Sequence, residues 1–159
     1  MPKRSAGLVL FRQREGDEIE VLLVHPGGPF WAKKDLGAWS IPKGEHADDE
    51  DPLAAARREF AEELGQAPPD GEPVPLGEVR QKGGKRVVAW ALEGDLDPAT
   101  VASNAFEIEW PPRSGRLQEF PEVDRAEWFS LEEARRRILQ GQIPLLEVLR
   151  GGRGRSSTT

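Results

Sequence analysis

The chain has no cysteine among its 159 residues, which excludes disulfide bonds, thiolate zinc sites and a cysteine nucleophile. It also has no run approaching the roughly 18 apolar residues of a transmembrane helix, so no membrane partner is expected. The basic N-terminus is followed by only a short apolar run, and a signal peptide is therefore not expected. A cytoplasmic protein is the resulting expectation.

A surplus of positive charge is absent as well, because 22 Lys and Arg residues stand against 28 Asp and Glu residues. Residues 45–63 alone hold eight acidic and two basic residues, so this segment carries the whole net charge of −6. A protein with one acidic segment and no basic stripe is not expected to bind duplex nucleic acid. It is suited to binding cations, and to binding anions through them.

The order of apolar segments predicts one mixed α/β domain over residues 1–150, followed by a low-complexity tail, residues 151–159, that we expect to be disordered. Strands are predicted at 4–12, 19–25, 74–82, 85–94, 106–110 and 125–129, and helices at 52–64, 131–139 and 142–150. Gly83 and Gly84 suit a two-residue hairpin turn, and Ser130 with Glu133 suits a capping box at the second helix. Residues 26–37, 67–73 and most of 95–119 are expected to be irregular.

The helix predicted at 52–64 has an unusual distribution of charge. Asp51 is a good N-cap, Pro52 a good first residue and Gly65 a good stop signal. Three carboxylates, those of Glu59, Glu62 and Glu63, crowd one face beside an apolar stripe that consists of Leu53, Ala56, Phe60 and Leu64. Like charges at this spacing repel by about 0.2–0.5 kcal/mol per pair, and a hard divalent cation such as Mg²⁺ would offset this repulsion.

The spacing of the residues around this helix resembles the Nudix box. The matching positions are Gly44, Glu50, Arg58, Glu59, Phe60, Glu62, Glu63 and Gly65. Gln66 departs from the pattern, which usually has an aliphatic residue there, and Trp39-Ser-Ile-Pro-Lys-Gly before the box is also similar to many Nudix proteins. The resemblance covers roughly residues 4–149, and it implies an α/β/α sandwich with a mixed β-sheet between helices.

The resemblance also implies a metal site for Mg²⁺ or Mn²⁺. By position in the box, Glu59, Glu62, Glu63 and the carbonyl of Gly44 are expected to hold the metal, and Arg58 to orient the glutamates. A further acid outside the box often completes such sites, and Glu122 is the candidate here, with Glu119 as its local competitor. Which of Glu59, Glu62 and Glu122 acts as the catalytic base stays open, because coupled carboxylates share protons and metals.

Candidate substrate-binding residues lie outside the acidic helix. Lys43 precedes the box, Trp31 lies in the loop at 26–37, and Lys82 and Arg86 flank the glycine turn at 83–84. Lysine and arginine bind phosphates, and an exposed tryptophan stacks on a base. The plain alternatives are a surface lysine, core packing of the tryptophan and a solvated hairpin turn.

The family implies hydrolysis of an acid anhydride, the pyrophosphate bond of a nucleoside diphosphate-linked substrate. The flanking segments are loosely similar to diadenosine tetraphosphate hydrolases, which favours a dinucleoside polyphosphate, although the chain has no tyrosine to stack a base. The alternatives are a nucleoside triphosphate pyrophosphohydrolase that clears the nucleotide pool, a non-catalytic Nudix-fold nucleotide-binding module, and a plain interaction protein. A small-molecule nucleotide or polyphosphate is thus the expected partner, and the protein is expected to be a monomer or a homodimer.

Overall fold

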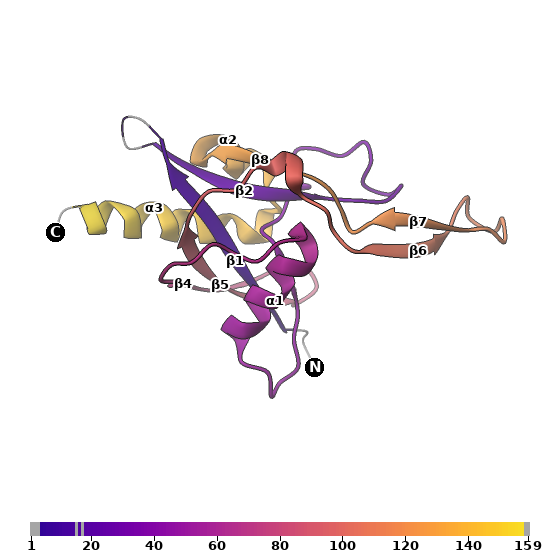
Figure 1. The fold of residues 1–159 in the computed structure, drawn as a ribbon, viewed down its shortest axis with the longest axis horizontal. Coiled ribbons are helices and arrows are strands. Elements are labelled where there is room, and N and C mark those ends of the chain that lie inside the picture. The colour runs from indigo at the N-terminus through magenta and orange to yellow at the C-terminus, as the bar shows by residue number, and fades with distance from the viewer. Residues whose placement is uncertain (1–3, 15, 17, 158–159) are drawn as a thin grey trace.

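The computed structural model describes residues 4–14, 16 and 18–157, and it contains a mixed β-sheet between helices (Figure 1). Five strands run in the order β4–β5–β1–β2–β8, and a short sixth strand, β3, pairs with β1. The sheet is mixed because β1 and β5 are parallel whereas the other pairs are antiparallel. The strands of this sheet are β1 Arg4–Gln13, β2 Ile19–Pro26, β3 Lys43–Glu45, β4 Val74–Arg80, β5 Arg86–Glu93 and β8 Val123–Ser130.

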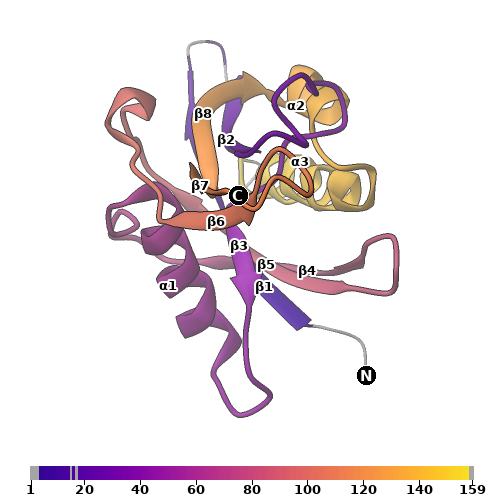
Figure 2. The ribbon, with the colours of Figure 1, turned by 90° about the vertical axis from the view of Figure 1, so that its right-hand side faces the viewer.

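Helices cover both faces of the sheet, which confirms the predicted α/β/α sandwich (Figure 2). Side chains of a strand alternate between faces, so Leu8 and Leu10 of β1 pack with Phe60 of α1, Pro52–Leu64. Val9 and Phe11 face the other side, toward α2 Leu131–Arg137 and α3 Ile143–Ser157. Two further short 3₁₀ helices are Pro98–Thr100 and Gln140–Gln142.

The central helix α1 begins and ends where its sequence predicts. The Asp51 carboxylate accepts a hydrogen bond from the backbone N–H of Ala54 at 3.0 Å, which caps the first turn. Gly65 adopts a left-handed conformation with φ of 75° and donates its N–H to the Ala61 carbonyl at 2.8 Å. Phe60 is fully buried, so the apolar stripe fixes which face of α1 points to solvent.

Other predictions need correction. Ser130 caps α2 by accepting from the Glu133 N–H at 3.1 Å, but the Glu133 side chain bonds to Arg136 and Arg137 and does not close a capping box. The last helix does not end at residue 150, where the sequence predicts its end, but continues to Ser157. The expected disordered tail, residues 151–159, therefore begins as helix in the structure, and residues 158–159 lie outside the described part.

Residues 95–119 contain more structure than the sequence predicts. β6 Ala105–Glu109 and β7 Leu117–Pro121 form a separate two-stranded hairpin, which we call the β6–β7 arm and which projects from the body of the protein (Figure 1). Among the described residues, no helix has both the length and the apolar character needed to cross a membrane.

Candidate active site

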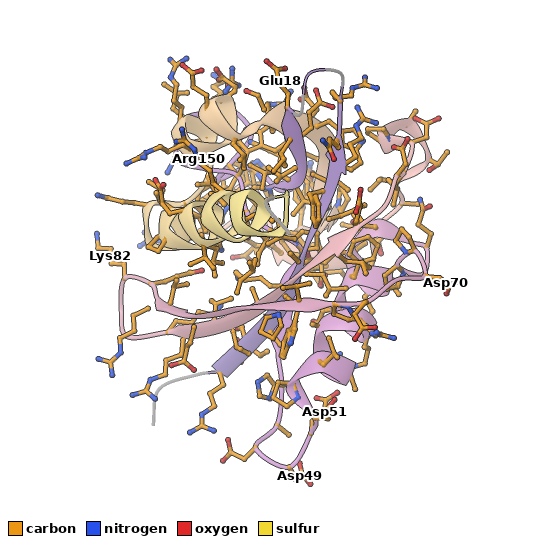
Figure 3. All side chains as sticks on the ribbon, turned by 90° about the vertical axis from the view of Figure 1, so that its left-hand side faces the viewer. Glu18, Asp49, Asp51, Asp70, Lys82 and Arg150 are labelled. Atoms are coloured by element: carbon orange, nitrogen blue, oxygen red, sulfur yellow. The ribbon has the colours of Figure 1, made fainter. Side chains whose placement is uncertain are left out.

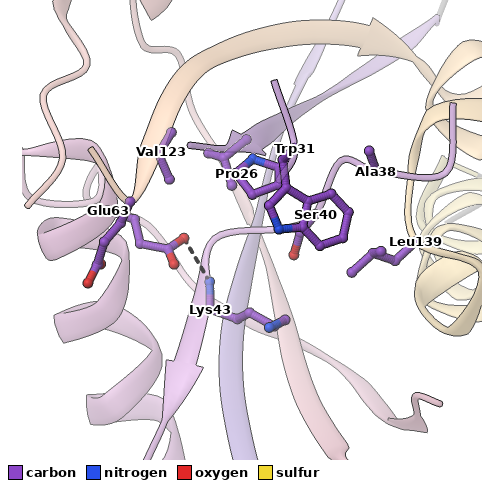
Figure 4. A pocket seen from close by; sticks show the side chains of 10 residues that line it. Pro26, Trp31, Ala38, Ser40, Lys43, Glu63, Val123 and Leu139 are labelled. Atoms are coloured by element: carbon purple, nitrogen blue, oxygen red, sulfur yellow. Dashed lines mark hydrogen bonds between the residues drawn. The ribbon is translucent and has the colours of Figure 1, made fainter. Parts of the chain in front are cut away.

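The short strand β3 brings the segment before α1 against the side of that helix. Gly44 pairs with Ala6 of β1, and a β-carbon added to Gly44 would lie 1.7 Å from Oε1 of Glu59. The preceding strand residue, Lys43, donates its backbone N–H to Oε1 of Glu63 at 3.3 Å (Figure 4). Two of the three predicted metal-binding glutamates of α1 therefore lie directly beside β3.

Arg58 is surrounded by carboxylates of the predicted site. Its guanidinium donates to both carboxylate oxygens of Glu50, at 3.1 and 3.2 Å. It also reaches one carboxylate oxygen each of Glu59 and Glu62, at 3.4 Å in both cases. The hydrogen bonds from Arg58, and to a smaller extent its charge, lower the pKa of Glu50. These contacts fit the predicted role of Arg58 in orienting the glutamates.

Two glutamates of this helix hold protons more tightly than free glutamates do. Burial raises the pKa of Glu59 to about 7, with a further contribution from the neighbouring Glu62 carboxylate, and Arg58 opposes this rise. Burial raises the pKa of Glu63 to about 8, and the nearby charges of Glu59 and Glu122 add to the rise. The carboxylates are thus close enough to disfavour one another's charge.

The chemistry of this donor set fits a hard divalent cation, because carboxylates and a backbone carbonyl supply the oxygen ligands that Mg²⁺ and Mn²⁺ prefer. In the conformation described, however, no three acidic or histidine side chains of the described residues converge as a ready metal site. Glu62 is turned toward Arg58 and Glu63 toward the backbone of Lys43.

A cavity of about 200 Å³ lies next to these carboxylates (Figure 4). Its wall includes Lys43 and Glu63 from the box region, Trp31 from the loop after β2, and Glu122 from the segment between β7 and β8. The remaining lining residues are Val24, Pro26, Ala38, Ser40, Val123 and Leu139. The cavity therefore has acidic, basic and aromatic walls.

Glu122, and not its competitor Glu119, faces the cavity. Glu119 is exposed on the β6–β7 arm, where it lies opposite Glu107. The backbone of Glu122 is fixed from two sides, because its N–H donates to the Asn104 carbonyl at 2.8 Å and its carbonyl accepts from Gly27 at 2.9 Å. The structure thus brings Glu122 together with Glu63 and Glu59, as the charge effects on both pKa values also indicate.

The predicted basic residues are only partly brought together. Burial, together with the nearby ammonium of Lys85, lowers the pKa of Lys43 to about 8. Lys82 is exposed at the β4–β5 turn, at the edge of the molecule (Figure 3), and it does not line the cavity. Arg86 lies 4.0 Å from Glu78, and within the described residues its Nε is buried without a hydrogen-bond partner. Lys85, which belongs to the same basic cluster around the turn, is therefore the lysine of this turn that approaches Lys43.

The sequence also gave no sign of the buried amide of Gln142. Its Oε1 accepts from the Ile41 N–H at 3.0 Å, and its Nε2 donates to Ser40 Oγ at 3.0 Å and to Gln81 Oε1 at 2.8 Å. This amide holds the chain between β2 and β3, which includes the cavity residue Ser40. A polar residue just before an apolar helix is the only local signal, and it does not reveal these distant partners.

Comparison with known proteins agrees with this geometry. The family model of the NUDIX domain matches residues 1–149. No curated protein sequence matches the chain. Similar solved structures include a Caenorhabditis elegans Ap4A hydrolase in a binary complex, with 24% identity, a TM-score of 0.64 and coverage of 92% of this chain and 96% of that chain.

Two further structures share the fold. A mutT/nudix family protein from Listeria innocua has 16% identity and a TM-score of 0.65, with 99% of this chain and 98% of that chain covered. The NUDIX domain of Shewanella oneidensis NrtR, complexed with ADP ribose, has 19% identity and a TM-score of 0.61, with 95% and 88% covered. At these identities the structural likeness shows the fold, and the family match carries the assignment. The chain therefore belongs to the Nudix family of pyrophosphohydrolases, which generally use divalent metal ions.

Proposed function

We propose that this protein hydrolyses a pyrophosphate bond in a dinucleoside polyphosphate. The observation that carries the proposal is the lining of one cavity by Glu63 and Glu122 together with Lys43 and Trp31. Acidic residues are suited to holding the cations that accompany a pyrophosphate, a lysine to contacting its oxygens, and a tryptophan to stacking on a base. A single small cavity therefore offers partners for each part of a nucleotide.

The proposed ligands for Mg²⁺ or Mn²⁺ are Glu59, Glu62, Glu63, Glu122 and the carbonyl of Gly44. A bound divalent cation neutralises charge on phosphate oxygens and lowers the pKa of an attacking water. Glycine at residue 44 leaves room for one of these ligands, because a β-carbon there would lie 1.7 Å from Oε1 of Glu59. Because Glu59 and Glu63 have raised pKa values, we expect cation binding to displace protons from them.

Six side chains are proposed to orient the reactants. Arg58 keeps the carboxylates of α1 in place through its contacts with Glu59 and Glu62. Lys43 contacts the phosphate chain, and Trp31, which lines the same cavity, stacks on the base. Lys82 and Arg86 stay proposed partners for distal phosphates, and Lys85 joins them because it is close to Lys43.

The choice of substrate has two supports. The solved C. elegans relative is an Ap4A hydrolase, and the flanks of the box already indicated a dinucleoside polyphosphate. The ADP ribose bound by the NUDIX domain of NrtR shares the nucleoside diphosphate unit that the proposed site would recognise. Nucleoside triphosphates are the rival substrates, and the same experiment distinguishes them.

The test is a panel of diadenosine tetraphosphate, ADP-ribose and the common nucleoside triphosphates, each with Mg²⁺ and with Mn²⁺, with products separated by chromatography. We expect metal-dependent turnover that is fastest for the dinucleoside substrate. Glu63→Gln should abolish this turnover without unfolding the protein, whereas Glu132→Gln, a matched change at an exposed residue of α2, should retain it. Faster turnover of a nucleoside triphosphate would replace the proposed substrate, and no turnover with any nucleotide would refute the proposed activity.

A further inference from the structure

An aromatic pair connects the loop after β2 with the β6–β7 arm. The ring of Phe30 meets that of Trp110 edge to face, with centroids 5.5 Å apart and an interplanar angle of 80°. Phe30 is 59% exposed, and neither ring belongs to the two hydrophobic clusters that form the core. Folding of the sandwich therefore does not explain why two large aromatic side chains meet here.

The loop runs outward along the arm from the cavity. Gly27 donates its N–H to the carbonyl of Glu122, the cavity residue that follows β7, at 2.9 Å. One residue further along the loop, a β-carbon on Gly28 would lie 2.9 Å from the ring of Phe106 in β6. Phe30 then reaches Trp110, just beyond the end of β6. The aromatic pair thus lies at the outer end of a surface whose inner end is the cavity wall.

Consecutive residues of this loop present their rings to different places. Trp31 lines the cavity (Figure 4), whereas Phe30 packs on the arm. A ligand that contacts both places must have two flat groups joined by a flexible linker that passes from the cavity to the arm.

The outer position is held in place by the backbone of the arm. The Trp110 N–H donates to the Arg116 carbonyl at 3.0 Å, and the Trp110 carbonyl accepts from the Gln118 side chain at 2.8 Å. The Glu109 carboxylate accepts from the N–H groups of Arg113 and Gly115, at 3.2 and 3.0 Å, which closes the turn. Because these bonds order the turn before any ligand arrives, binding there costs little conformational entropy.

We propose that Phe30 and Trp110 form a stacking surface for the second base of the substrate, whose first base lies against Trp31. The inference rests on the proposed function and makes it narrower, because it requires a nucleobase at both ends of the polyphosphate chain. Aromatic side chains stack on any base because every base has a π-face, so this surface recognises the presence of a second base and not its identity.

Two substrates that differ only in the second nucleoside test this proposal. Diadenosine tetraphosphate carries it, and adenosine 5′-tetraphosphate has the same phosphate chain without it. For Phe30→Ala and Trp110→Ala we expect KM for the dinucleoside substrate to rise roughly five- to a hundredfold, the loss that removing one base stack produces. KM for adenosine tetraphosphate, and kcat for both, should be unchanged. Phe30→Leu, which keeps the apolar volume but not the aromatic face, should behave like Phe30→Ala.

Leu117→Ala is the matched control, because Leu117 is 69% exposed on the same arm and has no aromatic ring. It should leave both KM values unchanged, and melting temperatures of all variants should match that of the wild type. Equal KM changes for both substrates, or none for either, would overturn the stacking surface. If the variants instead changed the oligomeric state with KM unaffected, the arm would be a self-association surface and the proposal would fail.

The outcome for the wild type separates this inference from the proposed function. Turnover of adenosine tetraphosphate with no preference for the dinucleoside substrate would overturn the second-base surface and leave the pyrophosphohydrolase activity standing. No metal-dependent turnover of either substrate or of the wider panel would overturn both.

Discussion

Gly44 and Glu59 are in such close contact that a β-carbon at residue 44 would lie 1.7 Å from the Glu59 carboxylate. The Glu59 side chain would have to turn away to make room for a methyl group. Because the displaced atoms are the end of a flexible side chain, the fold can accommodate this movement at little cost. The glycine is therefore needed for the position of the carboxylate more than for the stability of the sheet.

Gly44→Ala should lower kcat by roughly a hundredfold, the order expected when a catalytic group is misplaced by about 1 Å. Its melting temperature should stay close to that of the wild type. Gly151→Ala is the control, because a β-carbon there would meet nothing within 4 Å and alanine favours a helix. A Gly44→Ala protein with wild-type kcat would show that the contact has no role in the reaction.

The raised pKa values of Glu59 and Glu63 predict a pH dependence of stability. Their pKa values are about 7 and about 8 in the folded protein, against 4.5 for an ordinary glutamate. At pH values between 4.5 and these raised pKa values, the folded protein keeps protons that the unfolded chain has released. The contribution of the two glutamates to stability is therefore complete below pH 4.5 and is lost as the pH rises toward 8. Lys43 has the opposite effect, because its pKa is lowered from 10.5 to about 8. Between these two pH values the unfolded chain binds the extra proton, so stability rises with pH.

We therefore expect the melting temperature of the metal-free protein to fall from pH 5 to a minimum near pH 8. Glu63→Gln cannot ionise, so its melting temperature should depend less steeply on pH. Saturating Mg²⁺ should raise the wild-type melting temperature more at pH 8 than at pH 5, where protons compete for the carboxylates. A flat profile without metal would contradict the raised pKa values.

The parts of the site that the sequence predicts are those with local causes. The ends of α1 follow from Asp51 and Gly65, whose capping contacts lie within one turn of the helix. The position of Glu122 follows from a loop next to β8, a strand that its own pattern reveals. Such features depend on neighbours in the chain, and propensity and spacing are enough to find them.

The parts that the sequence does not predict depend on pairing between distant segments. Strand β3 is only three residues long and includes Gly44, so it has no strand pattern without its partner β1. The approach of Lys85 to Lys43 requires the parallel pairing of β1 with β5, which no local signal indicates. Gln142 likewise acquires its role from partners 61 to 102 residues away.

Gln142→Leu should be strongly destabilising, although leucine is similar in size. The change leaves the buried N–H of Ile41 without its acceptor, and Gln81 and Ser40 without their donor. An unsatisfied buried group costs about 1–3 kcal/mol, which corresponds to a fall in melting temperature of about 2–12 °C for a chain of this size. Gln140→Leu, at an exposed residue of the same 3₁₀ helix, is the control for thermal unfolding measurements. Equal melting temperatures for both variants would show that the amide network does not stabilise the segment.

Lys85 and Lys82 allow a direct test of which lysine of the β4–β5 turn reaches the substrate. Lys85 is close enough to Lys43 to lower its pKa, whereas Lys82 is exposed at the turn, and neither of the two lines the cavity. Two ammonium groups brought together repel each other, and a polyphosphate between them would remove that repulsion. Lys85→Ala should therefore raise KM for a polyphosphate substrate by about tenfold, the loss of one charge-assisted contact, and should raise the pKa of Lys43.

Lys82→Ala should change KM less than twofold under the same conditions, as expected for a weakly coupled surface charge. A larger effect of Lys82→Ala than of Lys85→Ala in steady-state kinetics at one ionic strength would assign the phosphate contact to the residue predicted from the sequence.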